Sequence, residues 1–239
     1  MPGILALSFA GPVAVIGDIH GRADLLDRLL AQLGDVPVLV AGDVCDRGPD
    51  SRGVIDRLIA RGARGVLGNH DEWLRAWALR EGFDDFALHP MMGGRATLDS
   101  YGVTGRTARE IEAQAFCVPS AHAEWLRGLA DAVDLQVAGA RYWVTHAGFS
   151  PRTAAEVPPA QRIAHLAEAN PRSLRWPKTA PQDVPDTGRT VIMGHVPLNA
   201  PLDLGHVIAI DTGAGVFPTG AALTAVVLPE RRFVTVRDG

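Results

Sequence analysis

Short apolar runs alternate with amphipathic stretches over residues 13–81, and this alternation constrains the fold more than any other feature of the chain. The run VAVI at 13–16 lies between Pro12 and Gly17, which is typical of a short buried strand. The pattern continues with a helix at 24–33, a strand at 36–41, a helix at 51–61, a short strand at 66–67 and a helix from 71 to about 81. This order of strands and helices predicts a parallel sheet with helices packed on its faces.

The rest of the chain divides into three parts. Strand signals are sparse over about 84–135, which predicts a helical insertion. Residues 150–188 are rich in proline, alanine and charge, and we expect a loop-and-helix excursion there that shapes the mouth of a substrate site. Further strands are predicted at 141–145, 190–193, 207–210, 223–228 and 233–236. We therefore predict an α/β fold in a single domain over residues 1–239.

Composition excludes several classes of protein. The 239 residues are 47% hydrophobic, enough for one large core, and the formal charge of −4 argues against a nucleic-acid-binding protein. Two cysteines do not make a disulfide framework or a multi-cysteine zinc site. The uncharged first seventeen residues lack the positive start of a secretory signal, and no long apolar run predicts a membrane span. We expect a cytoplasmic protein without membrane contact, and its oligomeric state stays open.

Side chains that bind metals follow five of the predicted strands. The segments are GDIHG at 17–21, GDVCDRG at 42–48, GNHD at 68–71, HAG at 146–148 and GH at 194–195. Because loops at the carboxyl ends of strands converge on one crevice in open α/β sheets, we expect these segments to meet. The candidate metal ligands are Asp18, His20, Asp43, Asn69, His146 and His195.

These residue types suit two metal ions held close together. Carboxylates and imidazoles favour manganese, iron or zinc over magnesium or calcium, and we expect Mn²⁺ first. Asp18 and His20 are close enough in sequence to bind one ion, and the two oxygens of Asp43 can bridge two ions. Each segment alone is commoner as a turn or a buried histidine, but their joint occurrence indicates a dinuclear centre. Cys45 is expected to pack as a small apolar side chain, with a ligand or redox role as the alternative.

Together these segments resemble the metallophosphoesterase superfamily. The GD-x-x-DRG loop is similar to that of the phosphoprotein-phosphatase branch, and GGRATLDSYG at 93–102 resembles a stretch of its bacterial and phage-type serine/threonine phosphatases. Diadenosine tetraphosphate hydrolases look like close relatives of that group. The resemblance extends over roughly 13–228. It implies the calcineurin-like fold, in which a central β-sandwich of mixed sheets is flanked by helices.

The resemblance also implies how the metals are held. One ion would be bound by the first three candidate ligands, and the second by Asp43 together with Asn69, His146 and His195. A water bridging the two cations would be deprotonated near neutral pH and attack phosphorus in line.

The resemblance implies catalytic roles for three further residues. His70 would be the general acid on the leaving-group oxygen, and Asp46 would orient it. Arg47 would clamp the phosphate oxygens.

Two positions depart from the family pattern. Asp71 stands where protein phosphatases usually carry glutamate, and the neighbouring Glu72 is available as a substitute. In LRWPK at 174–178, Lys178 falls where relatives have a phosphate-binding arginine, and lysine offers a point charge without the planar fork. Arg175 is the alternative phosphate contact, and the sequence does not choose between them.

The sequence thus predicts a dinuclear-metal-dependent phosphoesterase, most simply a protein serine/threonine phosphatase. The alternative is a diadenosine tetraphosphate hydrolase, for which Arg47, Arg95 and Arg106 are available to bind the polyphosphate. A non-catalytic metal-binding module would have lost a ligand or the acid pair, whereas His70 and Asp46 are both present. A nuclease would need a basic or aromatic surface for a strand, which the acidic composition opposes.

Overall fold

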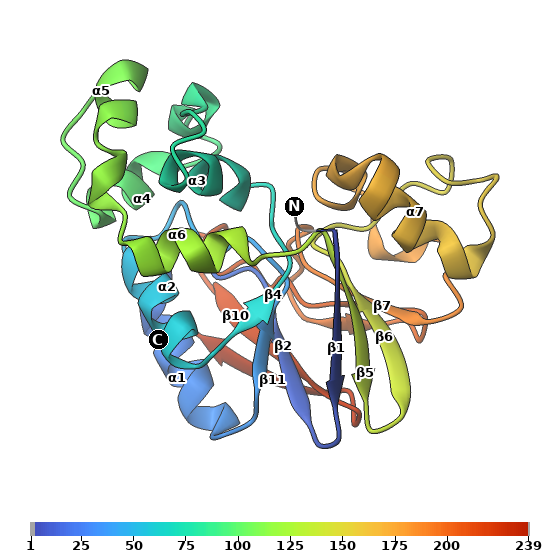
Figure 1. The fold of residues 1–239 in the computed structure, drawn as a ribbon. Helices are drawn as coiled ribbons and strands as arrows, with labels where there is room; N and C mark the ends of the chain where they lie inside the picture. Colours follow the sequence, from blue (N-terminus) through green and yellow to red (C-terminus); the bar gives the residue numbers. More distant parts are fainter. Residues whose placement is uncertain (1–2, 239) are drawn as a thin grey trace.

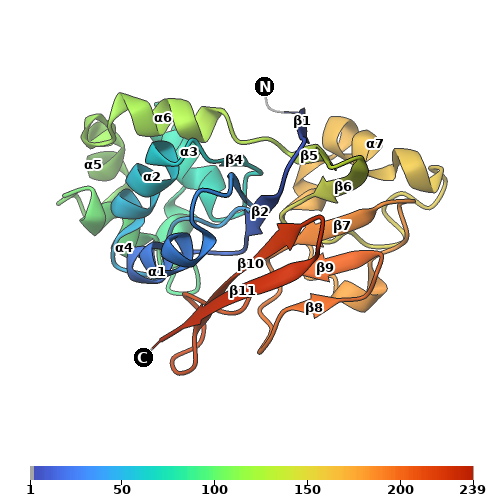
Figure 2. The ribbon, with the colours of Figure 1, turned by 90° about the horizontal axis from the view of Figure 1, so that it is seen from below.

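The computed structural model describes residues 3–238, which form two β-sheets packed face to face between helices (Figures 1 and 2). The first sheet has the strand order β11-β10-β2-β3-β4. Its strands are β2 (Val13–Ile16), β3 (Val38–Val40), β4 (Arg64–Gly65), β10 (Ala222–Leu228) and β11 (Arg232–Arg237). The strands β2, β3 and β4 run parallel, as the alternation predicts, whereas β10 pairs antiparallel with both β2 and β11.

The second sheet is also mixed and has the order β1-β5-β6-β7-β9-β8. Its strands are β1 (Ile4–Phe9), β5 (Ala132–Val137), β6 (Ala140–Val144), β7 (Thr190–Met193), β8 (Leu202–Asp203) and β9 (Val207–Ala209). The strands β6, β7 and β9 are parallel, so their carboxyl ends lie at one edge of the sheet.

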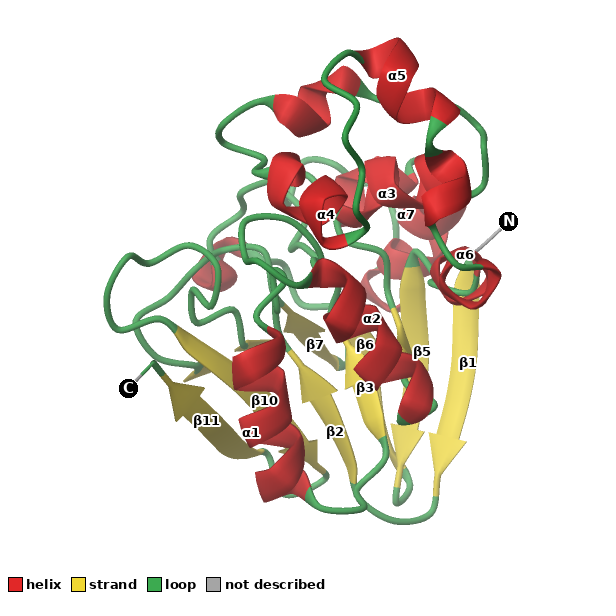
Figure 3. Cartoon of the chain, turned by 90° about the vertical axis from the view of Figure 1, so that its left-hand side faces the viewer, coloured by secondary structure: helices red, strands yellow, loops and turns green. Residues whose placement is uncertain are grey.

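Apolar side chains of β2 divide between two layers of the core. Val13 and Val15 belong to a cluster between the sheets, whereas Ala14 and Ile16 pack toward α1 (Ala23–Leu33) and α2 (Ser51–Ala60), which cover the outer face of the first sheet (Figure 3). A third cluster lies between the second sheet and α7 (Arg162–Ala169). Because the strand is buried on both faces, its sequence is a continuous apolar run rather than an alternation.

A group of helices lies beyond one end of the sheets (Figures 1 and 3). It comprises α3 (Asp71–Ala78), η1 (Asp85–Leu88), α4 (Gly94–Ser100), α5 (Ala108–Ala113), η2 (Ala115–Cys117) and α6 (Ser120–Arg127). The predicted insertion over 84–135 therefore ends earlier, because 132–135 already belong to β5. Asp134 and Gln136 alternate with apolar residues in that strand, a period-2 pattern that the sequence analysis did not use.

The excursion over 150–188 contains α7 and three short 3-10 helices, as expected. These are η3 (Pro159–Gln161), η4 (Pro171–Leu174) and η5 (Pro181–Asp183). The sequence analysis missed β1, β5 and β8, and it placed β4 two residues too late. The strand β1 pairs only along one edge, with β5, so its side chains are alternately half-buried and exposed.

Within residues 3–238, none of the helices combines the length and the apolar character that crossing a membrane requires. The single domain over residues 1–239 stays a prediction.

Candidate active site

The predicted ligand segments meet where strands of both sheets end. The first three follow β2, β3 and β4 of one sheet, and the segments at 146–148 and 194–195 follow β6 and β7 of the other. All six candidate ligands lie within these loops, and five of them are buried, with His195 half-buried. The structure therefore brings together the residues that are far apart in the sequence.

Backbone strain gathers in these loops. Eight non-glycine residues of the described chain have a positive φ, and five of them are candidate site residues. They are His20 at 46°, Asp43 at 51°, Asp46 at 72°, Arg47 at 66° and His195 at 68°. The left-handed region is unfavourable for such residues and persists only where the surrounding contacts impose it, which is common at functional sites.

Asp43 is shared by two groups of ligand atoms. His20, Asp43 and His70 form one group and Asp43, His146 and His195 the other, with the ligand atoms of each group within 4.8 Å of one another. The Oδ2 atom of Asp43 lies 3.6 Å from His20 Nε2 and 3.4 Å from His146 Nε2. A carboxylate in this position between two imidazoles is suited to bridge two cations.

Two histidines are oriented by main-chain carbonyls. His20 donates from Nδ1 to the Cys45 carbonyl, and His146 donates from Nδ1 to the Ala41 carbonyl, both at 2.8 Å. The Nε2 atom of each ring is therefore the nitrogen that would bind a metal ion, because the other ring nitrogen donates to a carbonyl as in most metal-binding histidines. The Oδ1 atom of Asn69 lies 3.0 Å from His146 Nε2. The donor set of imidazole, carboxylate and amide oxygen fits manganese, iron or zinc.

The protonation of these groups also fits a cation site. Burial opposes ionisation of Asp43, yet the imidazole of His146 beside it holds its pKa well below the usual range. Burial disfavours a charged His146 too, but the Asp43 carboxylate raises the pKa of His146 to about 10. Burial lowers the pKa of His195 to about 3, and that of His20 well below its usual value. Two neutral imidazoles are thus ready to bind a cation, which would displace the proton of the third.

Asp18 occupies a different position from the other ligands. Its carboxylate accepts a hydrogen bond from the main-chain amide of His195, at 3.1 Å and 3.2 Å to its two oxygens. Burial raises the pKa of Asp18 well above the usual range, and the neighbouring Asp211 raises it further. The sequence analysis gave no role to Asp211, although it follows β9 as Asp18 follows β2. Burial raises the pKa of Asp211 to about 6, and its side chain lines the same cavity as His195.

A buried hydrogen-bond network fixes His70. Its Nδ1 atom donates to Asp46 Oδ2 at 2.7 Å, and Asp46 also accepts from Trp73 Nε1 at 3.1 Å and from Thr97 Oγ1 at 2.9 Å. On the other side of the ring, Nε2 lies 3.0 Å from a guanidinium nitrogen of Arg47. Trp73 and Thr97 are positioning residues that the sequence analysis missed. Of the two, only Thr97 belongs to a segment that the sequence analysis singled out, the stretch at 93–102.

Arg47, His70 and four of the six candidate ligands, His20, Asp43, Asn69 and His195, line one cavity of about 190 Å³. The guanidinium of Arg47 reaches the Nε2 atoms of both His20 and His70. The remaining lining residues come from the helical group, the excursion and the loops after β7 and β9: Phe86, Met91, Met92, Trp176, Lys178, Pro197, Asp211 and Val216, beside Asp43, Asn69 and His195. Lys178, one of the two alternative phosphate contacts, is therefore at the cavity.

The other alternative, Arg175, lies elsewhere. Its side chain is buried, its Nε donates to Glu72 Oε1 at 2.7 Å, and its guanidinium pairs with Asp131. Glu72 also accepts from Trp176 Nε1 at 2.8 Å. Glu72 therefore holds the excursion against α3 and does not substitute for Asp71.

Asp71 joins two of the ligand loops. Its carboxylate accepts from the main-chain amides of Asp43 at 2.8 Å, Val44 at 2.9 Å and Gly68 at 2.9 Å. Gly68 fits because a Cβ atom there would lie 2.1 Å from the Asp43 carboxylate. Aspartate at this position therefore has a structural role, because it accepts hydrogen bonds from the main chain of two ligand loops.

We expect Arg175→Ala to lower the free energy of unfolding by about 3–5 kcal/mol, because it leaves the buried Asp131 carboxylate without its cation and removes the closer of two arginines from Glu72. Lys178→Ala removes an exposed side chain, so it should leave stability unchanged and raise KM. Chemical denaturation and steady-state kinetics of both variants check this. A stable Arg175→Ala protein with a raised KM would instead make Arg175 a phosphate contact.

Two arginines expected to bind polyphosphate lie away from the metal-ligand cavity. Arg95 and Arg106 line a separate cavity with Leu88 and Thr104. The Arg95 guanidinium is also engaged by Asp99, at 2.6 Å and 2.8 Å, and by the carbonyls of its own helix–loop region. Of the three arginines, the structure places Arg47 alone in the lining of the metal-ligand cavity.

A family model described as calcineurin-like phosphoesterase matches residues 11–231. The chain belongs to this family. The membership confirms the family and the fold class indicated by the sequence motifs, and it assigns the chain to the metal-dependent phosphoesterases.

Relatives of this calcineurin-like phosphoesterase carry a consistent name. A symmetrical bis(5'-nucleosyl)-tetraphosphatase of Paracidovorax citrulli is 31% identical over 166 residues, covering 66% of this chain and 50% of that protein. One of Acidovorax sp. is 46% identical over 69 residues, covering 26% of this chain and 25% of that protein. The matches thus span a quarter to a half of the length of these curated relatives.

A solved structure of the same fold is named as a candidate diadenosine tetraphosphatase. It superimposes with a TM-score of 0.64 at 20% identity and covers 100% of this chain and 99% of its own. At that identity the likeness shows the fold alone.

Proposed function

We propose that this calcineurin-like phosphoesterase hydrolyses dinucleoside polyphosphates, with diadenosine tetraphosphate cleaved symmetrically to two molecules of ADP. The observation that carries the proposal is the 31% identity over 166 residues to a symmetrical bis(5'-nucleosyl)-tetraphosphatase. The DRG loop favoured a phosphoprotein substrate in the sequence analysis, and the named relatives favour the second of the two substrates.

Six side chains would hold two divalent ions in this proposal, with Mn²⁺ expected first: Asp18, His20, Asp43, Asn69, His146 and His195. When bound, the ions supply charge stabilisation at the phosphoryl oxygens and acidify a water. Asp43 stands between the two groups of ligand atoms and would serve both ions.

His70 would protonate the leaving-group oxygen from Nε2. Because Nδ1 donates to Asp46, that carboxylate stabilises the imidazolium and keeps Nε2 directed at the cavity. Arg47 would donate to the phosphate oxygens, and its planar guanidinium suits a bidentate contact. Lys178 adds a second, less directional positive charge at the same cavity.

The test is a product analysis with two substrates in one tube. Purified protein with Mn²⁺ meets diadenosine tetraphosphate and a phosphoserine peptide, and mass spectrometry follows both. We expect the dinucleotide to give ADP alone while the peptide stays phosphorylated. Dephosphorylation of the peptide with the dinucleotide intact would overturn the proposal, and AMP with ATP as products would overturn symmetrical cleavage.

A further inference from the structure

Apolar side chains line the rim of the metal-ligand cavity, whereas candidate ligands form its floor. Six large apolar side chains are exposed among the described residues, and three of them, Phe86, Met91 and Val216, line this one cavity. Their exposed fractions are 45%, 69% and 38%, against 1% for His20 and 2% for Asp43. Apolar side chains gathered at the mouth of a site indicate a surface that a ligand covers.

Backbone hydrogen bonds connect this rim to the loop that carries Arg47. Phe86 lies in η1, where its amide donates to the Asp84 carboxylate at 3.0 Å. Two residues after Met91, the carbonyl of Gly93 accepts from the amide of Arg47 at 3.1 Å. A substrate whose phosphate contacts Arg47 therefore presents the group attached to that phosphate to the rim.

The ring of Phe86 is oriented but not enclosed. It stacks on His89, with ring centroids 5.5 Å apart and planes inclined by 23°. Nearly half of the phenylalanine remains exposed, and the neighbouring Met91 is a flexible, polarizable side chain that adapts to a flat partner. An aromatic platform beside a methionine is suited to a planar aromatic group.

We propose that Phe86, Met91 and Val216 form a nucleoside wall, on which the base of the substrate stacks while its phosphates reach Arg47 and Lys178. This proposal rests on the proposed function. The three side chains offer no amide or charged group to the backbone of a peptide, whereas every nucleobase has an aromatic face that stacks without hydrogen bonds. Arg47 and Lys178 line the same cavity as the nucleoside wall. A nucleotide needs both surfaces, because one end is a phosphate and the other a base.

The experiment compares two ligands that differ in the nucleoside. Isothermal titration calorimetry of the Mn²⁺-loaded protein measures the Kd of ADP and of methyl diphosphate, which keeps both phosphates and lacks the nucleoside. We expect Phe86→Ala to weaken ADP roughly 5- to 150-fold, the range for loss of one base–aromatic stack, with methyl diphosphate unchanged. Phe86→Trp should retain tight ADP binding, and Met91→Ala should weaken ADP in the same direction.

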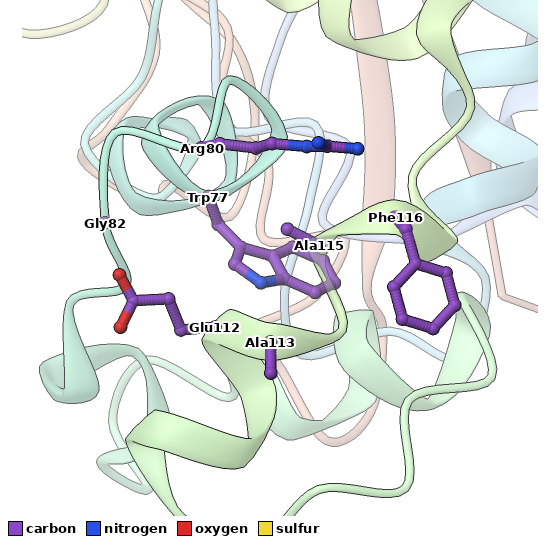
Figure 4. A pocket seen from close by; sticks show the side chains of 7 residues that line it. All are labelled: Trp77, Arg80, Gly82, Glu112, Ala113, Ala115 and Phe116. Carbon is purple, nitrogen blue, oxygen red and sulfur yellow. The ribbon is translucent and has the colours of Figure 1, made fainter.

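Phe116 supplies the matched control. It is 69% exposed, and it lines a separate cavity in the helical group with Trp77, Arg80 and Glu112 (Figure 4). Phe116→Ala should leave the Kd of both ligands unchanged.

Equal ADP binding by Phe86→Ala and the wild type would overturn the nucleoside wall, and so would an equal loss of both ligands. These results are separate from turnover. If the wild type fails to cleave diadenosine tetraphosphate, the proposed function fails, whereas the wall is judged by the difference between ADP and methyl diphosphate.

Discussion

His70→Asn should lower kcat about 10²- to 10⁴-fold, the usual contribution of a positioned proton donor, while the protein keeps its full content of bound metal. Asparagine removes the group that donates a proton from Nε2, and it leaves the carboxylate of Asp46 with its bonds from Trp73 and Thr97. Steady-state kinetics with diadenosine tetraphosphate and metal analysis of the same preparation measure the two quantities.

The metal content decides the role of His70. Its ligand atom lies within 4.8 Å of those of His20 and Asp43, so the distances alone also allow it to bind a cation. Loss of one metal equivalent in the variant would make His70 a ligand and remove it as the acid. Thr97→Val is a useful companion, because it loosens Asp46 without touching the ring. Its loss in kcat should be smaller than that of His70→Asn and its metal content normal.

Asp43→Asn should reduce bound metal at both positions and lower kcat by about 10³-fold or more. Asp43 alone belongs to both groups of ligand atoms within the described chain, and the amide that replaces it has one oxygen and no charge. Metal ions contribute several kcal/mol of charge stabilisation in phosphoryl transfer, and each 1.36 kcal/mol corresponds to about tenfold in rate. Metal titration by calorimetry and turnover at saturating Mn²⁺ provide the measurement.

Asp27→Asn is the control for this change. Its carboxylate pairs with Arg57 on the surface at 2.6 Å, and neither residue lines the cavity, so metal binding and turnover should match the wild type. If Asp43→Asn keeps two tightly bound ions, the carboxylate does not bridge them, and the two groups of ligand atoms act independently.

Much of the site could be predicted because its chemistry follows strand ends. Each ligand segment comes directly after a short apolar run, and a run of this length between turn residues is consistent with a buried strand. Asp18 and Asp43 could therefore be placed at one edge of a sheet before any coordinates were known. The sequence analysis also expected Asp43 to bridge two ions, and the structure adds the distances that place its carboxylate between His20 and His146.

The parts that escaped prediction depend on contacts between distant segments. Thr97 and Trp73 are ordinary helix residues until Asp46 is placed against them. An arginine such as Arg175 is a reasonable phosphate contact in the sequence. Its pairing with Glu72 and Asp131 depends on how the excursion packs against α3, which the sequence does not give. The strand β1 was missed; it pairs along a single edge, and every second side chain along it is exposed.

Asp71 has a consequence for the spacing of the site residues. Its carboxylate accepts from the main-chain amides of Asp43 and Gly68, and the residue before it in the chain is His70, the proposed proton donor. The amide of His70 also donates to the Asp43 carboxylate at 3.0 Å, so the two residues are linked both directly and through Asp71. We therefore expect the spacing between Asp43 and His70 to depend on contacts within these loops more than on the helices around them.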